Sequence, residues 1–489
     1  MRECGILMHI TSLPGPYGIG TLGKQAYAFI DFLERAGQHC WQLLPLNPTG
    51  YGNSPYQPCS AYAGNYYLID LQLLEAEGLL EKAELEAVTW CSREDQVDFG
   101  IQYENRLNLL RLAFDRFTDD AALESFCCEN SSWLSDFALY MALKEQYCGA
   151  PWYTWESPLK FRQPDALWQA RQQLRGQIRF YSFVQYLFYT QWQALRSYAK
   201  EKGVSFLGDV PFYIPMDSVE VWTDPELFQL DSTLTPTAVA GCPPDCFSSV
   251  GQLWRNPLYR WDVMKKDGYS WWLRRLRVAE KLYDAVRLDH FRGIAAYWSI
   301  PYGEDTALNG EWINGPGLDF IQTIQKQLPH LRLIAEDLGL LSPEVLQLRD
   351  DAGLPGMKVL QFAFENLAPS DYQPHTYPKN AVCYIGTHDN MTACQWLAAL
   401  SPEELAYVKA YCNLTEEEGF VWGLIRTALS SVAELCIVSL QDYLELGSEA
   451  RMNFPGTTEN NWVWRALPDS YHMSLADKIR RLTALYGRA

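Results

Sequence analysis

Eight short apolar segments recur along the chain, and most of them end in a polar or charged residue. They are residues 5–10, 40–46, 204–214, 284–291, 331–339, 357–364, 381–389 and 436–444. Segments of this length, bounded by Gly, Pro or charge, are typical of strands buried on both faces of a sheet. Helical patterns lie between several of them, for example over 23–37 and 315–328. This alternation of strand and helix predicts a parallel sheet.

Eight buried strands separated by helices favour a (β/α)₈ TIM barrel, although an open doubly wound sheet would give a similar pattern. A barrel of this kind needs roughly 250 residues. The chain has 489 residues, so the excess belongs in insertions. We expect one catalytic barrel over 1–489, with a mainly helical insertion at about 70–175, where apolar residues recur at helical spacing. A second, irregular insertion at about 215–262 is rich in Pro, Asp and Ser and is expected to lie over the cleft.

The charge of the chain argues against two classes of partner. Its formal net charge is −19 and its isoelectric point is about 4.9. Binding to nucleic acid or to an anionic membrane depends instead on clustered Lys and Arg. No uninterrupted apolar run is long enough for a membrane-spanning helix. We therefore expect neither a nucleic-acid nor a membrane partner, and the oligomeric state is not predicted.

The cysteines indicate a reducing compartment. There are 13, an odd number, at scattered positions and without a CxxC motif, which does not resemble a secreted disulfide framework. The nearest approach to a zinc motif is CPPDC at 242–246, and the chain has only 7 histidines. These features predict a cytoplasmic protein without a metal or other cofactor.

The segment AVRLDHFRG (285–293) places a cation and a carboxylate in an otherwise apolar and aromatic run. Side chains alternate along a strand, so Arg287 and Asp289 share a face. In a barrel that face points inward near the C-terminal mouth, where active sites form. A buried carboxylate is costly unless it is paired, and we expect Arg287 to keep Asp289 ionised by lowering its pKa. The alternative is an internal salt bridge that only fixes strand register.

Acidic residues end three further segments. Glu336 and Asp337 follow the fifth segment on opposite faces of the strand, so at most one points fully into the mouth. His388 and Asp389 end the seventh segment, and Asp209 ends a strand in the third. A single acid in such a position is explained by a helix cap. Four acids in corresponding positions predict a common site.

Several carboxylates with histidine and little lysine suit two kinds of chemistry. One is metal-assisted hydrolysis, with Asp, Glu and His as ligands; the other is glycosyl transfer by one ionised and one protonated acid. Aromatic rings favour the second, because they pack against the CH faces of sugars. Those near the segments are Trp41, Tyr51, Tyr56, Tyr62, Trp254, Tyr259 and Trp298. Each ring taken alone is better explained by the core, but as a set they favour carbohydrate.

Long motifs in a shared order make the chain resemble the 4-α-glucanotransferases (amylomaltases or disproportionating enzymes) of glycoside hydrolase family 77. They are SLPGPYGIGTLG (12–23), WQLLPLNPTGYGNSPYQPCSAYAGN (41–65), GDVPFYI (208–214), PPDCFSSVGQLWRNPLY (243–259), RLDHFRG (287–293), AEDLG (335–339), GTHDN (386–390) and RMNFPGTTENNWVWR (451–465). The resemblance implies a catalytic barrel with helical insertions. It also implies retaining transfer of α-1,4-glucan segments to the 4-hydroxyl of an acceptor through a covalent glycosyl-aspartate.

The resemblance further implies a role for nine residues. Asp289 matches the nucleophile, Glu336 the general acid and base, and Asp389 a third carboxylate that stabilises the transition state. The other matches are Arg287 and His388, which hold the nucleophile and sugar hydroxyls, Tyr56 and Asp209, which contact glucose, and the lining residues Gln252 and Asn453. The expected substrates are α-1,4-glucans (maltooligosaccharides, or fragments of starch or glycogen) and glucose.

Three alternatives and four departures from the family pattern stay open at this point. The alternatives are a retaining α-glucan hydrolase, a metal-dependent barrel hydrolase and an inactive glucan-binding protein. The departures are Cys246 for Tyr, Arg255 for Gly, Met391 for an acid and Tyr66 for Pro. None affects the three carboxylates, so we expect the departures to change acceptor affinity and product size rather than the chemistry.

Overall fold

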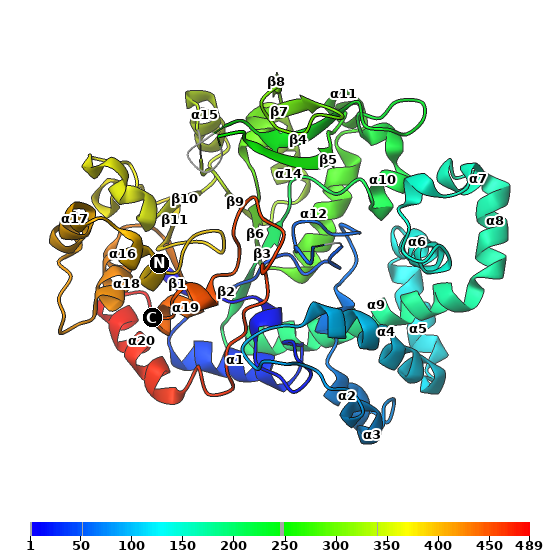
Figure 1. Cartoon of the computed structure of the whole chain (residues 1–489), viewed down its shortest axis with the longest axis horizontal. Coiled ribbons are helices and arrows are strands. Elements are labelled where there is room, and N and C mark those ends of the chain that lie inside the picture. The colour runs from blue at the N-terminus through cyan, green and yellow to red at the C-terminus, as the bar shows by residue number, and fades with distance from the viewer. Residues whose placement is uncertain (1, 51, 245–248, 340) are drawn as a thin grey trace.

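Eight parallel strands form the central sheet of the computed structural model, which describes residues 2–50, 52–244, 249–339 and 341–489 (Figure 1). The strands are Glu3–Leu7 (β1), Cys40–Gln42 (β2), Ser205–Val210 (β3), Ala285–Leu288 (β6), Arg332–Ala335 (β9), Gly356–Val359 (β10), Ala381–Tyr384 (β11) and Leu435–Ser439 (β12). Each lies within a segment predicted as a strand or begins one or two residues before it. The sequence therefore located every strand of this sheet.

The order of the strands makes the sheet a barrel. β1 pairs with both β2 and β12, and the order continues through β3 and β6 to β9, and through β11 to β10. The Ala335 N–H donates to the Pro355 carbonyl at 2.9 Å, which joins the end of β9 to the residue before β10. This arrangement confirms the predicted (β/α)₈ TIM barrel rather than an open doubly wound sheet.

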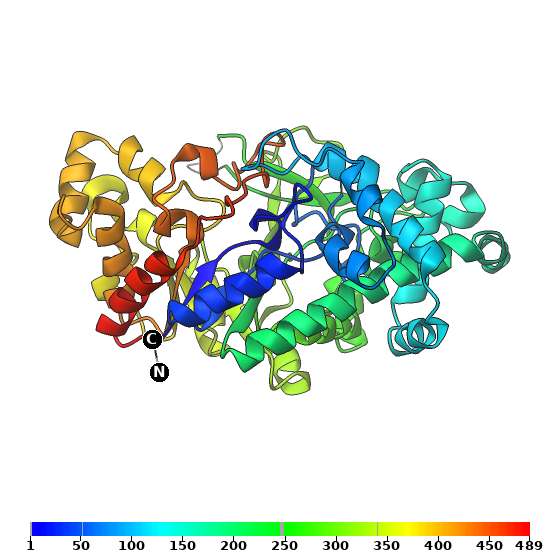
Figure 2. The same ribbon diagram turned by 90° about the horizontal axis from the view of Figure 1, so that it is seen from below.

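Helices pack around the outside of the barrel (Figure 2). The longer ones are Lys24–Arg35 (α1), Arg175–Glu201 (α9), Ser270–Leu282 (α12), Gly317–Gln327 (α14), Pro343–Asp351 (α15), Pro402–Cys412 (α17), Phe420–Ser430 (α18) and Met473–Leu485 (α20). Helix α1 shows the principle, because Phe29, Ile30 and Leu33 are spaced to share one face and are fully buried. Shorter helices are Arg292–Ala295 (α13), Ala393–Ala399 (α16) and Leu440–Tyr443 (α19), with 3₁₀ turns at Ile10–Ser12, Tyr66–Leu68, Trp152–Thr154, Pro225–Leu227, Leu360–Leu367, Pro374–Thr376 and Ser448–Ala450.

Between β2 and β3 the chain forms a run of helices that lies beside the barrel, on the right of Figure 1. They are Leu71–Ala76 (α2), Lys82–Glu86 (α3), Phe99–Arg116 (α4), Asp120–Glu129 (α5), Leu134–Gln146 (α6), Ser157–Lys160 (α7) and Pro164–Gln173 (α8). The helical pattern over 71–88 is split into α2 and α3, because Gly78 takes a φ of 75° just beyond α2. Within the described ranges, no helix is long and apolar enough to cross a membrane.

A second, antiparallel sheet stands over the mouth near β6 and β9 (Figure 1), and the sequence did not predict it. Its strands are Ala238–Cys242 (β4), Gln252–Pro257 (β5), Ala296–Pro301 (β7) and Glu311–Asn314 (β8), in the order β5-β4-β7-β8. Two of them lie in the stretch 215–262, together with the short helix Val219–Thr223 (α10), and a second short helix, Trp261–Lys266 (α11), begins at its end. Part of the stretch expected to be irregular is therefore ordered as strands.

Candidate active site

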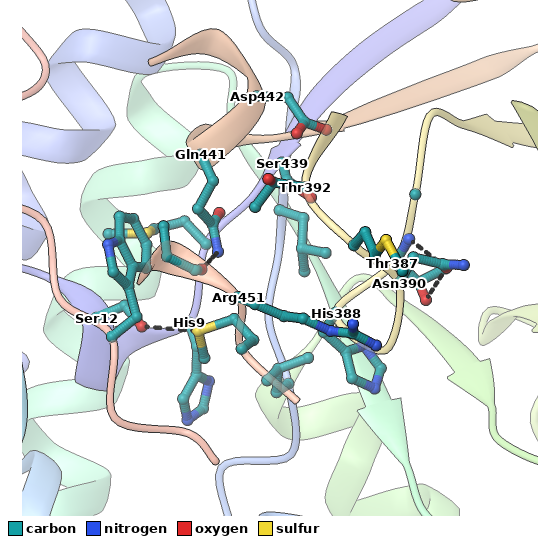
Figure 3. A pocket seen from close by; sticks show the side chains of 18 residues that line it. His9, Ser12, Thr387, His388, Asn390, Thr392, Ser439, Gln441, Asp442 and Arg451 are labelled. Carbon is teal, nitrogen blue, oxygen red and sulfur yellow. Dashed lines mark hydrogen bonds between the residues drawn. The ribbon is translucent and has the colours of Figure 1, made fainter. Parts of the chain in front are cut away.

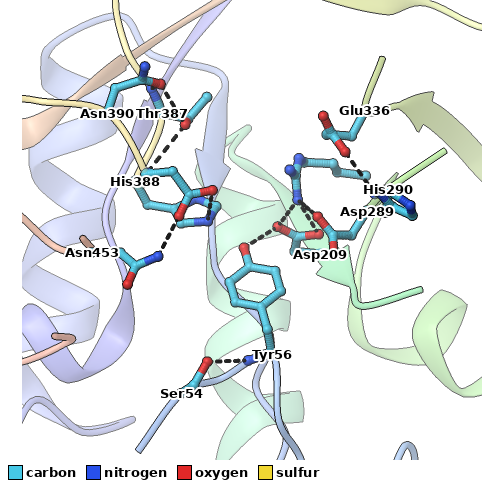
Figure 4. A network of polar contacts seen from close by, with 12 residues as sticks. Ser54, Tyr56, Asp209, Asp289, His290, Glu336, Thr387, His388, Asn390 and Asn453 are labelled. Carbon is cyan, nitrogen blue, oxygen red and sulfur yellow. Dashed lines mark hydrogen bonds and ion pairs between the residues drawn. The ribbon is translucent and has the colours of Figure 1, made fainter. Parts of the chain in front are cut away.

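The ends of four barrel strands bring the predicted acids to one mouth (Figure 4). Asp209 lies in β3, while Asp289, Glu336 and Asp389 follow β6, β9 and β11. Asp209 is in register with Arg287 of β6, so these two side chains lie at the same level of the barrel wall. The Asp289 carboxylate interacts electrostatically with Asp209, Asp389 and Glu336. Residues from four distant parts of the sequence thus form one acidic cluster.

Arg287 is the buried cation of this cluster. Its Nη1 lies 2.9 and 2.7 Å from the two carboxylate oxygens of Asp209 and 3.0 Å from Oδ1 of Asp289. The hydroxyl of Tyr56 donates to Asp209 at 2.7 Å. Both Arg287 and Asp209 are almost completely buried, where an unpaired charge would be very costly. Arg287 therefore allows two carboxylates to approach each other in a dry environment.

The pKa of Asp289 is higher than the sequence indicated. Burial raises it to about 6; Arg287 opposes this shift, while Asp209 and Asp389 add to it. The expectation that Arg287 would hold this pKa low is therefore wrong in its net direction. The physical reason is that Arg287 is shared with Asp209, and that desolvation has a larger effect than one shared cation.

The pKa of Glu336 is raised further, to about 8, by burial and by the charges of Asp289 and Asp337, while Arg287 and the Leu338 N–H oppose the shift. This agrees with the elevated pKa that we expected for a proton donor. The backbone N–H groups of His290 and Leu338 donate to its two oxygens at 2.8 and 3.0 Å, so the carboxyl group is held in one orientation.

Asp337, the neighbour of Glu336, points away from the site, as strand alternation predicts. Its oxygens accept hydrogen bonds from Arg349 at 2.5 Å and from the Met357 N–H at 2.6 Å. Asp337 therefore joins the end of β9 to β10 and to α15, and it has a structural role.

Asp389 is the acid held most firmly in its ionised form. Burial alone would raise its pKa, but His388 and Asn453 overcome that effect and lower it well below the usual range. His388 Nε2 lies 3.3 Å from one carboxylate oxygen, and Asn453 donates to the other at 2.6 Å. The Arg451 guanidinium also donates to the Asp389 carbonyl at 3.0 Å. Asp389 is therefore held by two segments of the chain, the loop after β11 and the loop that carries Arg451 and Asn453.

Aromatic rings flank the acids on two sides. Tyr56 stacks on His388 with ring centroids 5.1 Å apart, and Trp462 lies 5.8 Å from Tyr56. On the other side Trp254 meets the ring of His290 edge-on at 4.8 Å, and its indole N–H donates to Gln252 at 3.2 Å. Flat apolar faces beside charged oxygens are the lining that a sugar requires.

The remaining aromatic residues of the predicted set have other places. Trp41, Tyr62 and Tyr259 are buried in the core, as expected for any single ring. Trp298 belongs to the second sheet, and Tyr51 lies outside the described residues. Of that set, Tyr56 and Trp254 are the rings seen beside the carboxylates.

Three contributors to the site were not singled out in the sequence. His290 supplies a backbone N–H, from a residue whose positive φ of 48° is unusual outside glycine. Trp462 and Arg451 come from the motif 451–465, in which only Asn453 was assigned a role. The sequence shows an aromatic residue and a cation in a family motif, which could have pointed to Trp462 and Arg451. Their contacts, however, depend on how that loop folds over the mouth of the barrel.

A cavity of about 20 Å³ lies behind His388 (Figure 3). It is lined by His9 and Asp442, and also by Met391, one of the departures from the family pattern. Burial and His388 lower the pKa of His9 to about 3, and burial raises the pKa of Asp442 to about 7. The cavity has room for about one water molecule and none for a sugar. Its lining residues are therefore part of the packing that surrounds His388.

Two of the other departures, Tyr66 and Arg255, make none of the contacts to the carboxylates described above. Arg255 is exposed on β5 with a φ of 65°, Tyr66 begins a 3₁₀ turn, and Cys246 lies outside the described residues. No group of three His, Cys, Asp or Glu side chains in the described ranges is arranged to hold a metal ion. What the site offers is two neighbouring carboxyl groups, Asp289 and Glu336, with different proton affinities beside aromatic rings, an arrangement suited to glycosyl transfer.

Comparison with known proteins agrees with this geometry. The sequence model of the 4-alpha-glucanotransferases matches residues 8–469. The 4-alpha-glucanotransferase of Clostridium butyricum is 45% identical over 98% of this chain and 100% of its own length. The Thermus thermophilus enzyme of the same name is 46% identical, with 96% and 95% covered. The solved amylomaltase of Streptococcus agalactiae, in complex with acarbose, has a TM-score of 0.98 and 39% identity over 100% of both chains.

These matches extend from end to end, including the parts outside the barrel. The chain therefore belongs to glycoside hydrolase family 77, the 4-alpha-glucanotransferases, and its activity is the transfer of α-1,4-glucan segments.

Proposed function

We propose that Asp289 is the nucleophile and Glu336 the general acid and base of this transfer. The observation that supports the assignment most directly is the difference in pKa between two neighbouring buried carboxyl groups, about 6 for Asp289 and about 8 for Glu336. At neutral pH the first is mainly ionised and the second mainly protonated. Those are the states that a nucleophile and a proton donor require.

In the first step Asp289 attacks the anomeric carbon of a glucosyl unit while the Glu336 proton passes to the departing glycosidic oxygen. The C–O bond to the leaving fragment breaks as the ester to Asp289 forms. In the second step Glu336 removes the proton of an acceptor 4-hydroxyl, whose oxygen displaces Asp289. Two inversions retain the α configuration, and the two carboxyl groups of such enzymes lie about 5–5.5 Å apart.

The surrounding residues are assigned positioning and binding roles. Asp389 is proposed to accept hydrogen bonds from ring hydroxyls, more strongly in the transition state than in the bound substrate. Arg287 orients Asp289 and shares its charge with Asp209. The proposed sugar contacts are Tyr56, Asp209, Gln252, His388 and Asn453.

The proposed donors and acceptors are maltooligosaccharides or fragments of starch or glycogen, with glucose as the smallest acceptor. A retaining hydrolase would use the same carboxylates, but the family match favours transfer. For the architecture, we propose that 1–489 is a single catalytic unit in which about 70–175 is a helical insertion and about 215–262 covers the cleft. A cytoplasmic location is proposed because buried cysteines such as Cys4, Cys40 and Cys412 are free thiols.

The test is the Asp289→Asn variant, assayed with maltotriose. The wild-type enzyme should yield glucose together with a ladder of longer α-1,4-glucans. The variant should lose about a thousandfold or more of this activity, because an amide is not an effective nucleophile, while its circular dichroism spectrum stays unchanged. Full activity in the variant would refute the assignment of Asp289. Wild-type products no longer than maltotriose would favour the hydrolase.

A further inference from the structure

We infer that Trp312, on the outer strand of the second sheet, is a stacking platform for the acceptor glucan beyond the sugar units at the carboxylates. The inference rests on the proposed function, since the role of Glu336 as general acid and base identifies the glucan beside Trp312 as the acceptor rather than the donor. It adds a residue that sets the preference for acceptor length.

The second sheet displays Trp312 on its outer face. Trp312 of β8 is opposite Trp298 of β7, which in turn is opposite Gly241 of β4, and Gly241 is opposite Leu253 of β5. Residues opposite one another share a face of the sheet. Trp312 remains 41% exposed at the edge of this row, although a large aromatic side chain is usually buried.

The ring of Trp312 is held in place before any ligand binds. Trp298 meets it edge-on with centroids 5.1 Å apart, and the Trp298 indole N–H is itself fixed by a 2.9 Å hydrogen bond to the Ala307 carbonyl. The guanidinium carbon of Arg292 lies 3.9 Å from the Trp312 ring centroid. Because the guanidinium packs on the ring and Trp298 fixes its orientation, the exposed part of the ring loses little conformational entropy when a sugar stacks on it.

Arg292 also connects Trp312 to the proton donor. The preceding residue, Phe291, donates its N–H to the Glu336 carbonyl at 3.1 Å, and the His290 N–H donates to the Glu336 side chain at 2.8 Å. The Arg292 guanidinium therefore both packs on the exposed indole and interacts electrostatically with the Glu336 carboxyl group. Because Glu336 exchanges its proton with the oxygen of the leaving or accepting glucan, the glucan on this side is the acceptor.

The surface beside Trp312 suits an α-glucan. Val250 and Leu308 are exposed by 45% and 51%, and their segments are joined by the 3.1 Å hydrogen bond from the Ala307 N–H to the Val250 carbonyl. Trp298 links these segments to Trp312, because its indole N–H donates to the Ala307 carbonyl at 2.9 Å and its ring centroid lies 5.1 Å from that of Trp312. Exposed apolar side chains beside an exposed indole offer flat contacts for the CH faces of successive glucose units.

The experiment compares acceptors of different length in wild type and Trp312→Ala. Isotope-labelled glucose and labelled maltohexaose are supplied as acceptors to a fixed concentration of maltotriose, and the label in lengthened products is counted. The variant should raise the KM for maltohexaose about five- to tenfold, the loss expected for one stacking contact. Transfer to glucose should stay within about twofold, and Trp312→Phe should recover most of the maltohexaose affinity.

Tyr302→Ala is the matched control, because Tyr302 is a 56% exposed aromatic residue that follows β7 at the far end of the same sheet. It should behave as wild type with both acceptors. The inference is overturned if Trp312→Ala leaves the KM for maltohexaose unchanged, if both acceptors are affected equally, or if Tyr302→Ala has the same effect. Failure of the proposed function would look different, because with wild type itself no label from glucose would then appear in lengthened products.

Discussion

Two buried carboxyl groups are expected to set the pH range in which this enzyme works. Asp289, the proposed nucleophile, has a pKa of about 6 and must be ionised to attack, so activity should fall as the pH drops through 6. Glu336, the proposed proton donor, has a pKa of about 8 and must be protonated to donate, so activity should fall as the pH rises through 8. We expect a bell-shaped dependence of kcat/KM on pH with limbs near these values. Initial rates with maltotriose across this range would show it, and a rate that stays constant well above pH 8 would contradict the role of Glu336.

Replacing Arg287 measures how strongly this one cation lowers the pKa of Asp289 while it also pairs with Asp209. Replacing it as Arg287→Met leaves Asp209 and Asp289 buried without their cation, so we expect the acidic limb of the pH profile to move to higher pH. The loss of a buried pair should also lower the free energy of unfolding by about 3 kcal/mol. Urea unfolding at pH 7 measures the second effect.

Arg287→Lys is the control for this prediction, because it keeps a positive charge while changing the shape of the donor. Its acidic limb should lie between those of wild type and Arg287→Met. An unchanged limb in Arg287→Met would show that desolvation alone sets the pKa of Asp289.

At the scale of single elements, the barrel strands could be predicted because each is a short apolar run that ends in a polar residue. The alternation of side chains along β9 also predicted that Glu336 and Asp337 point to opposite faces. The second sheet could not be predicted in this way. One face of this sheet adds Ala240 and Tyr297 to the main core, while the other buries only a small separate core around Val239, Ile300 and Ala307, so the apolar patterns of its strands are weak.

The carboxylates of the site could be predicted because an acid at the end of a buried strand is conspicuous. Their proton affinities could not, because the pKa of Asp289 depends on Arg287 being shared with Asp209. The contributions of His290 and Trp462 could not be predicted either. His290 contributes a backbone N–H and Trp462 a ring from a distant loop, and both reach the site only through tertiary contacts.

Arg255 on β5 combines an unfavourable backbone conformation with a departure from the family pattern. Its φ of 65° lies where the register between β4 and β5 shifts, and a left-handed residue at such a bulge is usually glycine. Arg255→Gly should therefore stabilise the protein by about 0.5–1 kcal/mol, the relief of strain less the added entropy of the unfolded chain.

Arg255→Ala separates strain from the loss of the side chain. Alanine keeps a Cβ atom and so keeps the strain, and this variant should unfold at or below the urea concentration needed for wild type. Equal stabilisation by both substitutions would attribute the effect to the arginine side chain rather than to the backbone.

At the scale of the whole molecule, the first strand, β1, and the C-terminal residues lie close together on the left of Figure 1. Arg488, only 1% exposed, donates to the carbonyls of Leu429, Glu3, Ser431 and Ala433 at 2.7–2.9 Å. Those carbonyls flank β1 and β12, which are first and last in sequence but adjacent in the sheet. The penultimate residue thus connects the N-terminal strand to the C-terminal one.

Arg488→Met should remove a donor from each of these carbonyls, of which Ser431 keeps a second hydrogen bond from Arg2 at 2.8 Å, at a cost of about 3 kcal/mol in the free energy of unfolding. The active site lies at the opposite end of the strands, so kcat for maltotriose at 25 °C should not change. Arg480→Met is the control, because Arg480 is an exposed arginine with one carbonyl contact at 3.3 Å. A urea midpoint for Arg488→Met equal to that of Arg480→Met would mean that the barrel closes between β1 and β12 without help from the C-terminus.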